Sequence, residues 1–126
     1  MKKLVLAALL ALAPGAALAA DLSGGWNVAG AFDAMGIKFT SACKLAQDSS
    51  GKLTGTCQGT QQESAATTGT VTTGADGKTA VEFAYDTSYQ GSPVHLDYKG
   101  AVQADGTLAG TVDAGGVSGT FTATKQ

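Results

Sequence analysis

A pair of cysteines inside one predicted β-hairpin, residues 38–59, constrains the fold of this chain more than any other feature. Apolar residues alternate on both sides of Ser49-Ser50-Gly51, and a three-residue loop that ends in glycine is a common hairpin connection. Such a loop pairs residues whose numbers sum to 100, so Cys43 lies opposite Cys57. Directly opposed residues of antiparallel strands are close enough to be bridged. Turn chemistry and spacing therefore both predict a Cys43–Cys57 disulfide.

Similar turns are expected further along the chain. Ala75-Asp76-Gly77 and Ala104-Asp105-Gly106 have the composition of three-residue hairpin loops, and Ala114-Gly115 that of a two-residue turn. Each choice keeps apolar residues on one face, which a slip of one residue would reverse. The expected pairs are Val71 with Val81, Gly69 with Phe83, Val102 with Leu108, Gly100 with Gly110, Val112 with Val117, and Gly110 with Gly119.

Eight strands are expected in all, and no helical periodicity outside the first twenty residues competes with them. They lie at 26–32, on both sides of the turn within 38–59, and at 67–73, 81–85, 94–102, 108–112 and 117–123. Consecutive hairpins with one apolar face favour closure, because an open sheet would leave that face wet and its edges unpaired. We therefore expect an all-β fold, an eight-stranded antiparallel up-and-down β-barrel. A two-sheet β-sandwich is the alternative.

The first twenty residues have the composition of a secretory signal peptide. Lys2 and Lys3 precede an apolar run, residues 4–13, and Ala17-Leu18-Ala19 resembles a cleavage site. We expect residues 1–20 to be removed and residues 21–126 to form a single barrel domain, periplasmic or secreted. An oxidising compartment also favours the disulfide. No second apolar stretch is long enough to cross a bilayer, so we expect a protein that does not span the membrane.

Charge argues against a nucleic-acid partner. The basic residues are all lysines, and without the first twenty residues six lysines face ten acidic residues, a net charge of −4. Binding to phosphates needs clustered Lys and Arg. We expect a monomer whose partner is either a small apolar ligand or another protein.

The sequence offers no arrangement typical of an enzyme or a metal site. His95 is the only histidine, and its strand position, shared with Asp97 and Lys99, points outward. No Gly-x-Ser-x-Gly motif supplies a serine nucleophile. Most aspartates fall at predicted turns, where Asp is favoured for turn geometry. We expect no catalytic residue, no metal and no cofactor.

The inward-facing aromatic residues are the candidate ligand-binding residues. They are Trp26, Phe32, Phe39, Phe83, Tyr85, Tyr98 and Phe121. They can form a packed core or the walls of a pocket, since an eight-stranded barrel is just filled by side chains or holds one small ligand. Two of them are tyrosines, and a buried phenol needs a hydrogen-bond partner.

Three inward glycines, Gly100, Gly110 and Gly119, are predicted to lie side by side and to leave a groove in the barrel wall. Protein interiors are close-packed, so the groove should receive a ring, from Trp26 or Phe32, or a ligand. Alternatively, the glycines only allow the strands to coil.

The residues Leu22-Ser23-Gly24-Gly25-Trp26, followed by about eight strands, resemble the calycin group. That group contains lipocalins, avidins and small bacterial metalloprotease inhibitors. The Gly-x-Trp matches the start of the first lipocalin strand, and residues 51–56, Gly-Lys-Leu-Thr-Gly-Thr, are similar to avidins. The chain has one tryptophan where avidins line the biotin site with several, and Lys125 is the only late cation where lipocalins pack an arginine on the tryptophan. The resemblance implies an exported, calycin-like barrel.

Two functions follow as hypotheses. The first is binding of a small, largely apolar ligand in the barrel interior. The second is a protein-interaction module, an inhibitor or envelope accessory protein, with a packed core and active loops at residues 61–66 and 88–93. A cavity of several hundred Å3 favours the first, and a filled barrel with an exposed apolar patch favours the second.

Overall fold

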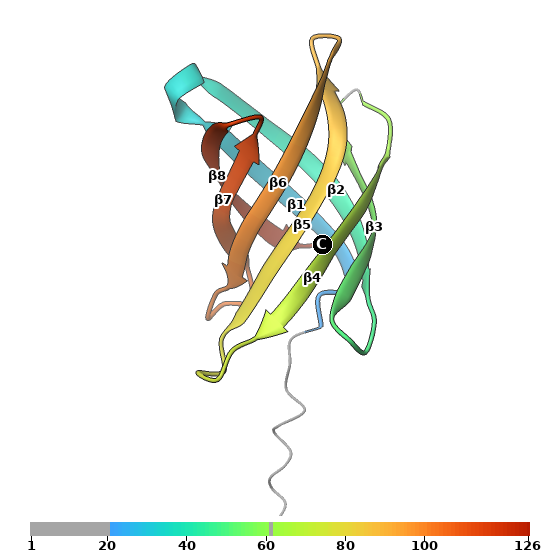
Figure 1. Cartoon of the computed structure of the whole chain (residues 1–126), viewed down its shortest axis with the longest axis vertical. Helices are drawn as coiled ribbons and strands as arrows, with labels where there is room; N and C mark the ends of the chain where they lie inside the picture. Colours follow the sequence, from blue (N-terminus) through green and yellow to red (C-terminus); the bar gives the residue numbers. More distant parts are fainter. Residues whose placement is uncertain (1–20, 61) are drawn as a thin grey trace, which may run out of the picture.

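The computed structural model describes residues 21–60 and 62–126, so the predicted signal peptide, residues 1–20, lies outside the described residues. The chain forms a closed barrel of eight antiparallel strands, each paired with its neighbours in sequence (Figure 1). The strands are β1 (Gly24–Phe32), β2 (Ile37–Gln47), β3 (Lys52–Gly59), β4 (Ala65–Thr73), β5 (Thr79–Tyr89), β6 (Ser92–Val102), β7 (Leu108–Ala114) and β8 (Val117–Lys125). The pairing of β1 with β8, from Trp26 opposite Lys125 to Ala31 opposite Thr120, closes the barrel. The expected barrel is confirmed, and the sandwich alternative is wrong.

The described residues contain no helix that is long and apolar enough to cross a membrane.

The three glycine-ended loops have the predicted register. Cys43 lies opposite Cys57, Val71 opposite Val81, and Val102 opposite Leu108. Each loop places its glycine, Gly51, Gly77 or Gly106, at a φ between 81° and 90°, a conformation that residues with a side chain rarely adopt. Cys43 and Cys57 form the predicted disulfide, with their Cα atoms 4.0 Å apart.

The predicted turn between β7 and β8 is wrong: the turn lies one residue further along the chain, so each β7 residue pairs with a β8 residue two positions beyond the expected one. The turn residues are Gly115 and Gly116, with φ values of 59° and 97°, and Ala114 pairs with Val117. Two consecutive residues with positive φ are what a tight two-residue turn with the twist of a hairpin requires, and a Gly-Gly pair supplies them without strain. Gly110 therefore lies opposite Phe121, and Gly119 lies opposite Val112.

The segment 88–93, predicted as a loop, is mostly strand. Ser88 pairs with Pro93 and Tyr89 with Ser92, and the turn is Gln90-Gly91. Proline is tolerated at position 93 because the β7 partners of β6 begin only at Leu96, so this part of β6 is an edge on that side. The other predicted loop, 61–66, is also shorter than expected, since β4 begins at Ala65 and Gln61 lies outside the described residues.

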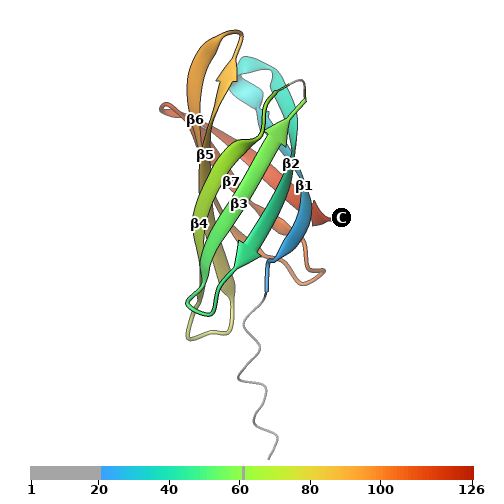
Figure 2. The same cartoon turned by 90° about the vertical axis from the view of Figure 1, so that its right-hand side faces the viewer.

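The two ends of the barrel differ in their connections. We call the end with the turns at 48–51, 74–78 and 103–107 the base, and the chain enters β1 there (Figures 1 and 2). The other end, the mouth, carries the short 3-10 helix η3 (Asp33–Met35), the link from β3 to β4, and the two tight turns at 90–91 and 115–116. The β5–β6 hairpin projects farthest at the mouth (Figure 1). The interior is therefore bounded by two different sets of loops.

The three glycines that were predicted to lie side by side, Gly100, Gly110 and Gly119, do not form one row, because Gly119 is not opposite Gly110. Aromatic rings nevertheless fill the space beside Gly100 and Gly119. A Cβ atom on Gly100 would lie 2.9 Å from Cζ of Phe121, and one on Gly119 would lie 2.8 Å from Cδ1 of Phe32. Phe32 was one of the two rings expected there. Trp26, the other expected ring, is not among the nearest atoms to any of the three glycines.

Candidate functional site

A cavity of about 830 Å3 opens at the mouth half of the barrel. Its lining also includes outward-facing residues of β1, β2 and β8, such as Ala31, Thr40 and Thr122, so part of this volume lies on the outer face of the wall. Its inner walls come from inward positions of β1, β2, β5, β6 and β8, which the alternation of each strand turns toward the barrel axis. Most of these side chains are apolar; the largest are Phe32, Ile37, Phe39, Leu96 and Phe121. Tyr85 and Ser41 add hydroxyl groups. The arrangement is that of a binding pocket with a few polar groups in apolar walls.

The seven predicted ligand-binding residues divide into two groups. Phe32, Phe39, Tyr85 and Phe121 line the cavity. Trp26, Phe83 and Tyr98 do not, because they lie in the packed part of the interior. Four of the seven predicted residues therefore lie in the cavity wall, and three do not.

An aromatic cluster closes the cavity toward the base. Phe83 and Tyr98 stack with ring centroids 4.5 Å apart, and Phe121 packs edge-on against both, at 6.1 and 5.1 Å. Such offset and edge-to-face pairs are favourable beyond the apolar area that they bury. Below the cluster the base half is filled by buried aliphatic side chains, including Leu53, Val81 and Leu108. The interior is therefore solid at one end and hollow at the other.

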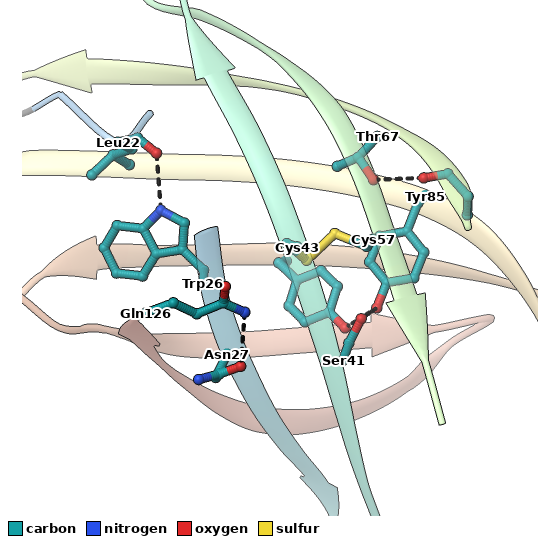
Figure 3. The surroundings of a disulfide bond; sticks show 11 residues. Leu22, Trp26, Asn27, Ser41, Cys43, Cys57, Thr67, Tyr85 and Gln126 are labelled. Carbon is teal, nitrogen blue, oxygen red and sulfur yellow. Dashed lines mark hydrogen bonds between the residues drawn. A yellow bond between two sulfur atoms is a disulfide. The ribbon is translucent and has the colours of Figure 1, made fainter. Parts of the chain in front are cut away.

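Trp26 seals the base. Its indole Nε1 donates a hydrogen bond to the carbonyl oxygen of Leu22 at 2.9 Å (Figure 3), and the Leu22 amide donates to Oε1 of Gln47 at 2.8 Å. The ammonium of Lys125 lies 5.5 Å from the centroid of the indole ring, within the range of a cation–π contact. The segment before β1 is thus folded back across the barrel end, and Trp26 has a structural position far from the mouth.

Three hydroxyl groups lie together at the inner end of the cavity. The Tyr85 and Tyr98 hydroxyl oxygens are 2.7 Å apart, and the Tyr85 hydroxyl donates to Oγ of Ser41 at 3.3 Å (Figure 3). Burial raises the pKa of the Tyr98 phenol well above its usual range, and the neighbouring Tyr85 hydroxyl raises it further. The phenol is therefore neutral and remains a hydrogen-bond donor. This cluster supplies both buried tyrosines with the partners that they need.

The rim of the mouth combines a hydrogen-bonded glutamine with exposed apolar side chains. Gln62 accepts a hydrogen bond from Thr87 Oγ1 at 2.6 Å and donates through Nε2 to the Ser88 carbonyl oxygen at 2.6 Å. These bonds tie the link between β3 and β4 to β5. Around this point Met35, Tyr89 and Val117 are the large apolar residues most exposed among those described, at 55%, 48% and 37%.

Several wall residues had not been named as site candidates. Ile37 shares the parity of Phe39, so extending the alternation of β2 by two residues would have found it. Val94 and Leu96 lie on the inward face of β6. Met35 and Gln62 lie in the connections at the mouth, where strand alternation gives no signal.

The remaining polar candidates lie outside the cavity. Nδ1 of His95 is 2.7 Å from Oδ1 of Asp86, and both side chains are exposed, at 61% and 84%. This pair sits on the outer face of the β5–β6 hairpin. No group of three or more His, Cys, Asp or Glu residues in the described part of the chain is arranged to hold a metal ion.

No protein family, curated protein or solved structure matches this chain. The geometry of the barrel interior is therefore the basis for a functional proposal.

Proposed function

We propose that this protein is an exported, calycin-like barrel, periplasmic or secreted, that binds a small, largely apolar ligand in the mouth-end cavity. The observation that carries the proposal is the interior part of the cavity, whose walls include Phe32, Phe39, Leu96 and Phe121; the whole cavity, with its part on the outer face, measures about 830 Å3. Ligand pockets commonly have volumes of roughly 300 to 1,000 Å3 and a small number of polar groups that orient the ligand. The hydroxyl cluster at the inner end is such a group.

The walls favour an uncharged or weakly polar ligand. Lys38 is the one charged residue among the described residues at the cavity, and its position opposite Ala31 places it on the outward face of β2. Apolar surface removed from water contributes roughly 25 cal/mol per Å2, whereas an unpaired charge is costly to bury. Affinity would therefore come from apolar contact with the rings and aliphatic side chains of the walls.

The exposed rim supports the same proposal. Met35, Tyr89 and Val117 extend apolar surface from the cavity to the outside. Isolated apolar residues on a surface need no explanation, but three residues that line one cavity form a continuous path for an apolar molecule.

The contact between Lys125 and Trp26 supports the calycin-like part of the proposal. Gly24-Gly25-Trp26 opens β1, and a cation from the last strand lies over the indole ring. Lipocalins pack an arginine on the tryptophan that opens their first strand; that arginine is missing here, and the contact of Lys125 with Trp26 is similar in kind.

The alternative proposal is a protein-interaction module, and its specific support is the same exposed rim. That hypothesis expects a packed core, whereas the mouth half of this barrel contains the cavity. A partner that covers the rim would leave the cavity empty, so ligand binding is the better explanation for the space.

The test uses the uncharged fluorescent probe N-phenyl-1-naphthylamine with the purified protein of residues 21–126. We expect saturable binding at one site. Val94 lines the mouth, so Val94→Trp should fill the opening and weaken binding by about tenfold or more, equivalent to about 1.4 kcal/mol. The matched control is His95→Trp, which places the same side chain one residue away on the outer face and should bind like the parent. Absence of binding, or equal binding by both variants, would contradict the proposal.

A further inference from the structure

The hydroxyl cluster at the inner end of the cavity has one more hydrogen than it has internal hydrogen bonds. Ser41, Tyr85 and Tyr98 each carry one O–H group, and the three oxygens form a chain with two contacts, at 3.3 and 2.7 Å. A linear chain of three hydroxyls uses two hydrogens in its two bonds. The third hydrogen belongs to one end of the chain, Ser41 or Tyr98.

The direction of the chain decides which end keeps the free hydrogen. In one direction, Ser41 donates to Tyr85 and Tyr85 donates to Tyr98, so the Tyr98 hydrogen has no acceptor. The Tyr98 side chain is fully buried and does not line the cavity, so neither water nor a ligand could accept this hydrogen. A buried donor without an acceptor is unfavourable. The other direction, Tyr98 to Tyr85 to Ser41, agrees with the donation from Tyr85 to Ser41 Oγ. The free hydrogen is then on Ser41.

Within residues 21–60 and 62–126, the Ser41 side chain has no hydrogen-bond partner other than Tyr85, and Ser41 is only 5% exposed. It is one of the residues that line the cavity. Its hydroxyl is thus a nearly buried donor that borders the cavity at its inner end.

We infer that the Ser41 hydroxyl is the recognition donor of the cavity and that the ligand carries a neutral hydrogen-bond acceptor, a carbonyl, ester or ether oxygen, at its inner end. This inference rests on the proposed function, since it names the class of ligand for the same cavity. The acceptor satisfies the free hydrogen of the chain, and the rest of the ligand contacts the apolar walls.

The surroundings of Ser41 favour a neutral acceptor over an anion. The hydrogen-bonded neighbours of Ser41 are the two phenols, and the rings of Phe39 and Phe121 line the same cavity. Among the described residues of the lining the one basic side chain is Lys38, which is on the outward face of β2. A carboxylate would lose its hydration there without gaining a positive partner. A carbonyl or ether oxygen loses much less on leaving water and regains one hydrogen bond.

The test compares two probes of nearly equal shape, 2-acetylnaphthalene, which carries a ketone, and 2-ethylnaphthalene, which lacks it. Isothermal titration calorimetry gives the ratio of the hydrocarbon Kd to the ketone Kd. The variant carries Ser41→Ala, Tyr85→Phe and Tyr98→Phe together, because removing Ser41 alone would free the Tyr85 hydrogen as a substitute donor. We expect the ratio to fall by a factor of about 10 in the variant, while hydrocarbon binding is retained.

The matched control is Thr67→Val, which removes another buried hydroxyl, bonded to the Ala65 carbonyl oxygen and away from the cavity. Its ratio should equal that of the parent. If the parent binds both probes and the ratio changes less than about twofold in the triple variant, the role of Ser41 is overturned and the proposed function stands. If the parent binds neither probe, this inference and ligand binding in the cavity both fail. Retained hydrocarbon binding by the triple variant shows that it is folded. If the triple variant alone loses both probes, the comparison is repeated with the double variant Ser41→Ala/Tyr85→Phe, which retains neither of these two hydroxyls of the cavity lining. An unchanged ratio in that double variant would overturn the inference.

Discussion

Individual residues give the two barrel ends different properties. Trp26 at the base combines burial, a hydrogen bond to the Leu22 carbonyl and a contact with Lys125. Ser41 and Tyr85 at the cavity combine burial with hydroxyl groups that border an open space. A nearly buried polar atom therefore stabilises the structure at the base, whereas at the mouth it supports the binding role that we propose.

Trp26→Ala should lower the free energy of unfolding by roughly 3 to 5 kcal/mol, because a large aromatic side chain with 2% of its surface exposed is replaced by a methyl group. Trp26→Phe should cost less, since a ring still fills most of the space and the main loss is the bond to Leu22. Urea denaturation of both variants measures the difference. A loss below about 1 kcal/mol for Trp26→Ala would mean that the base does not need this side chain.

At the level of elements, the sequence predicted the hairpins whose turns permit one pairing. Gly51, Gly77 and Gly106 each end a three-residue loop, and a shift of one residue would have turned an apolar face outward. The β7–β8 turn failed because Ala114-Gly115 and Gly115-Gly116 give registers that differ by two residues and keep the same faces. Alternation along a strand cannot separate such registers. Backbone conformation decides between them, and only the second choice places glycine at both turn positions.

The β5–β6 hairpin was misjudged for a different reason. Residues 88–93 were expected to form a loop, yet they are mostly strand, and Pro93 lies where β6 has no β7 partner. Gln90, which has a φ of 52°, occupies a turn position where glycine or asparagine is more common. Only the second turn position, Gly91, therefore carries a residue typical of such a turn.

The close approach of β6 and β7 leads to a prediction about Gly100. An added Cβ would lie 2.6 Å from the Ala109 carbonyl oxygen and 2.9 Å from the Phe121 ring, so Gly100→Ala must separate the strands or move the ring. We expect a loss of roughly 1 to 3 kcal/mol in the free energy of unfolding, as for an overpacked core. Gly25→Ala is the control, because its nearest neighbour is the end of the flexible Gln126 side chain. Equal thermal stability of both variants would show that β6 and β7 separate without cost.

At the level of the whole molecule, closure of the barrel was predictable and the distribution of space inside it was not. Alternation identified the inward residues, but it does not say which of them meet at the same height along the axis. Tyr85 and Phe121 reach the cavity, whereas Phe83, on the same face of β5 as Tyr85, is packed against Tyr98. The height of each side chain depends on the stagger of all eight strands. The two-residue error at β7–β8 alone shifts Phe121 relative to its predicted neighbours.

The division into a solid base and a hollow mouth predicts that equal truncations have unequal costs. Leu53 is fully buried among the packed side chains of the base, so Leu53→Ala should create a new void and lower the free energy of unfolding by roughly 2 to 5 kcal/mol. Leu96 also faces inward and is 7% exposed, but it already borders the cavity. Leu96→Ala would enlarge an existing space, lose contacts on one side only, and cost clearly less.

Urea denaturation of the two variants compares these costs, and binding of N-phenyl-1-naphthylamine checks the location of each change. Leu96→Ala should alter the affinity for the probe, because the side chain forms part of the cavity wall, while Leu53→Ala should leave it close to that of the parent at temperatures where both are folded. If the two substitutions destabilise the protein equally and neither changes probe binding, the mouth half is as tightly packed as the base. Ligand binding inside the barrel would then lose its structural basis, and the exposed rim of Met35, Tyr89 and Val117 would become the principal candidate surface.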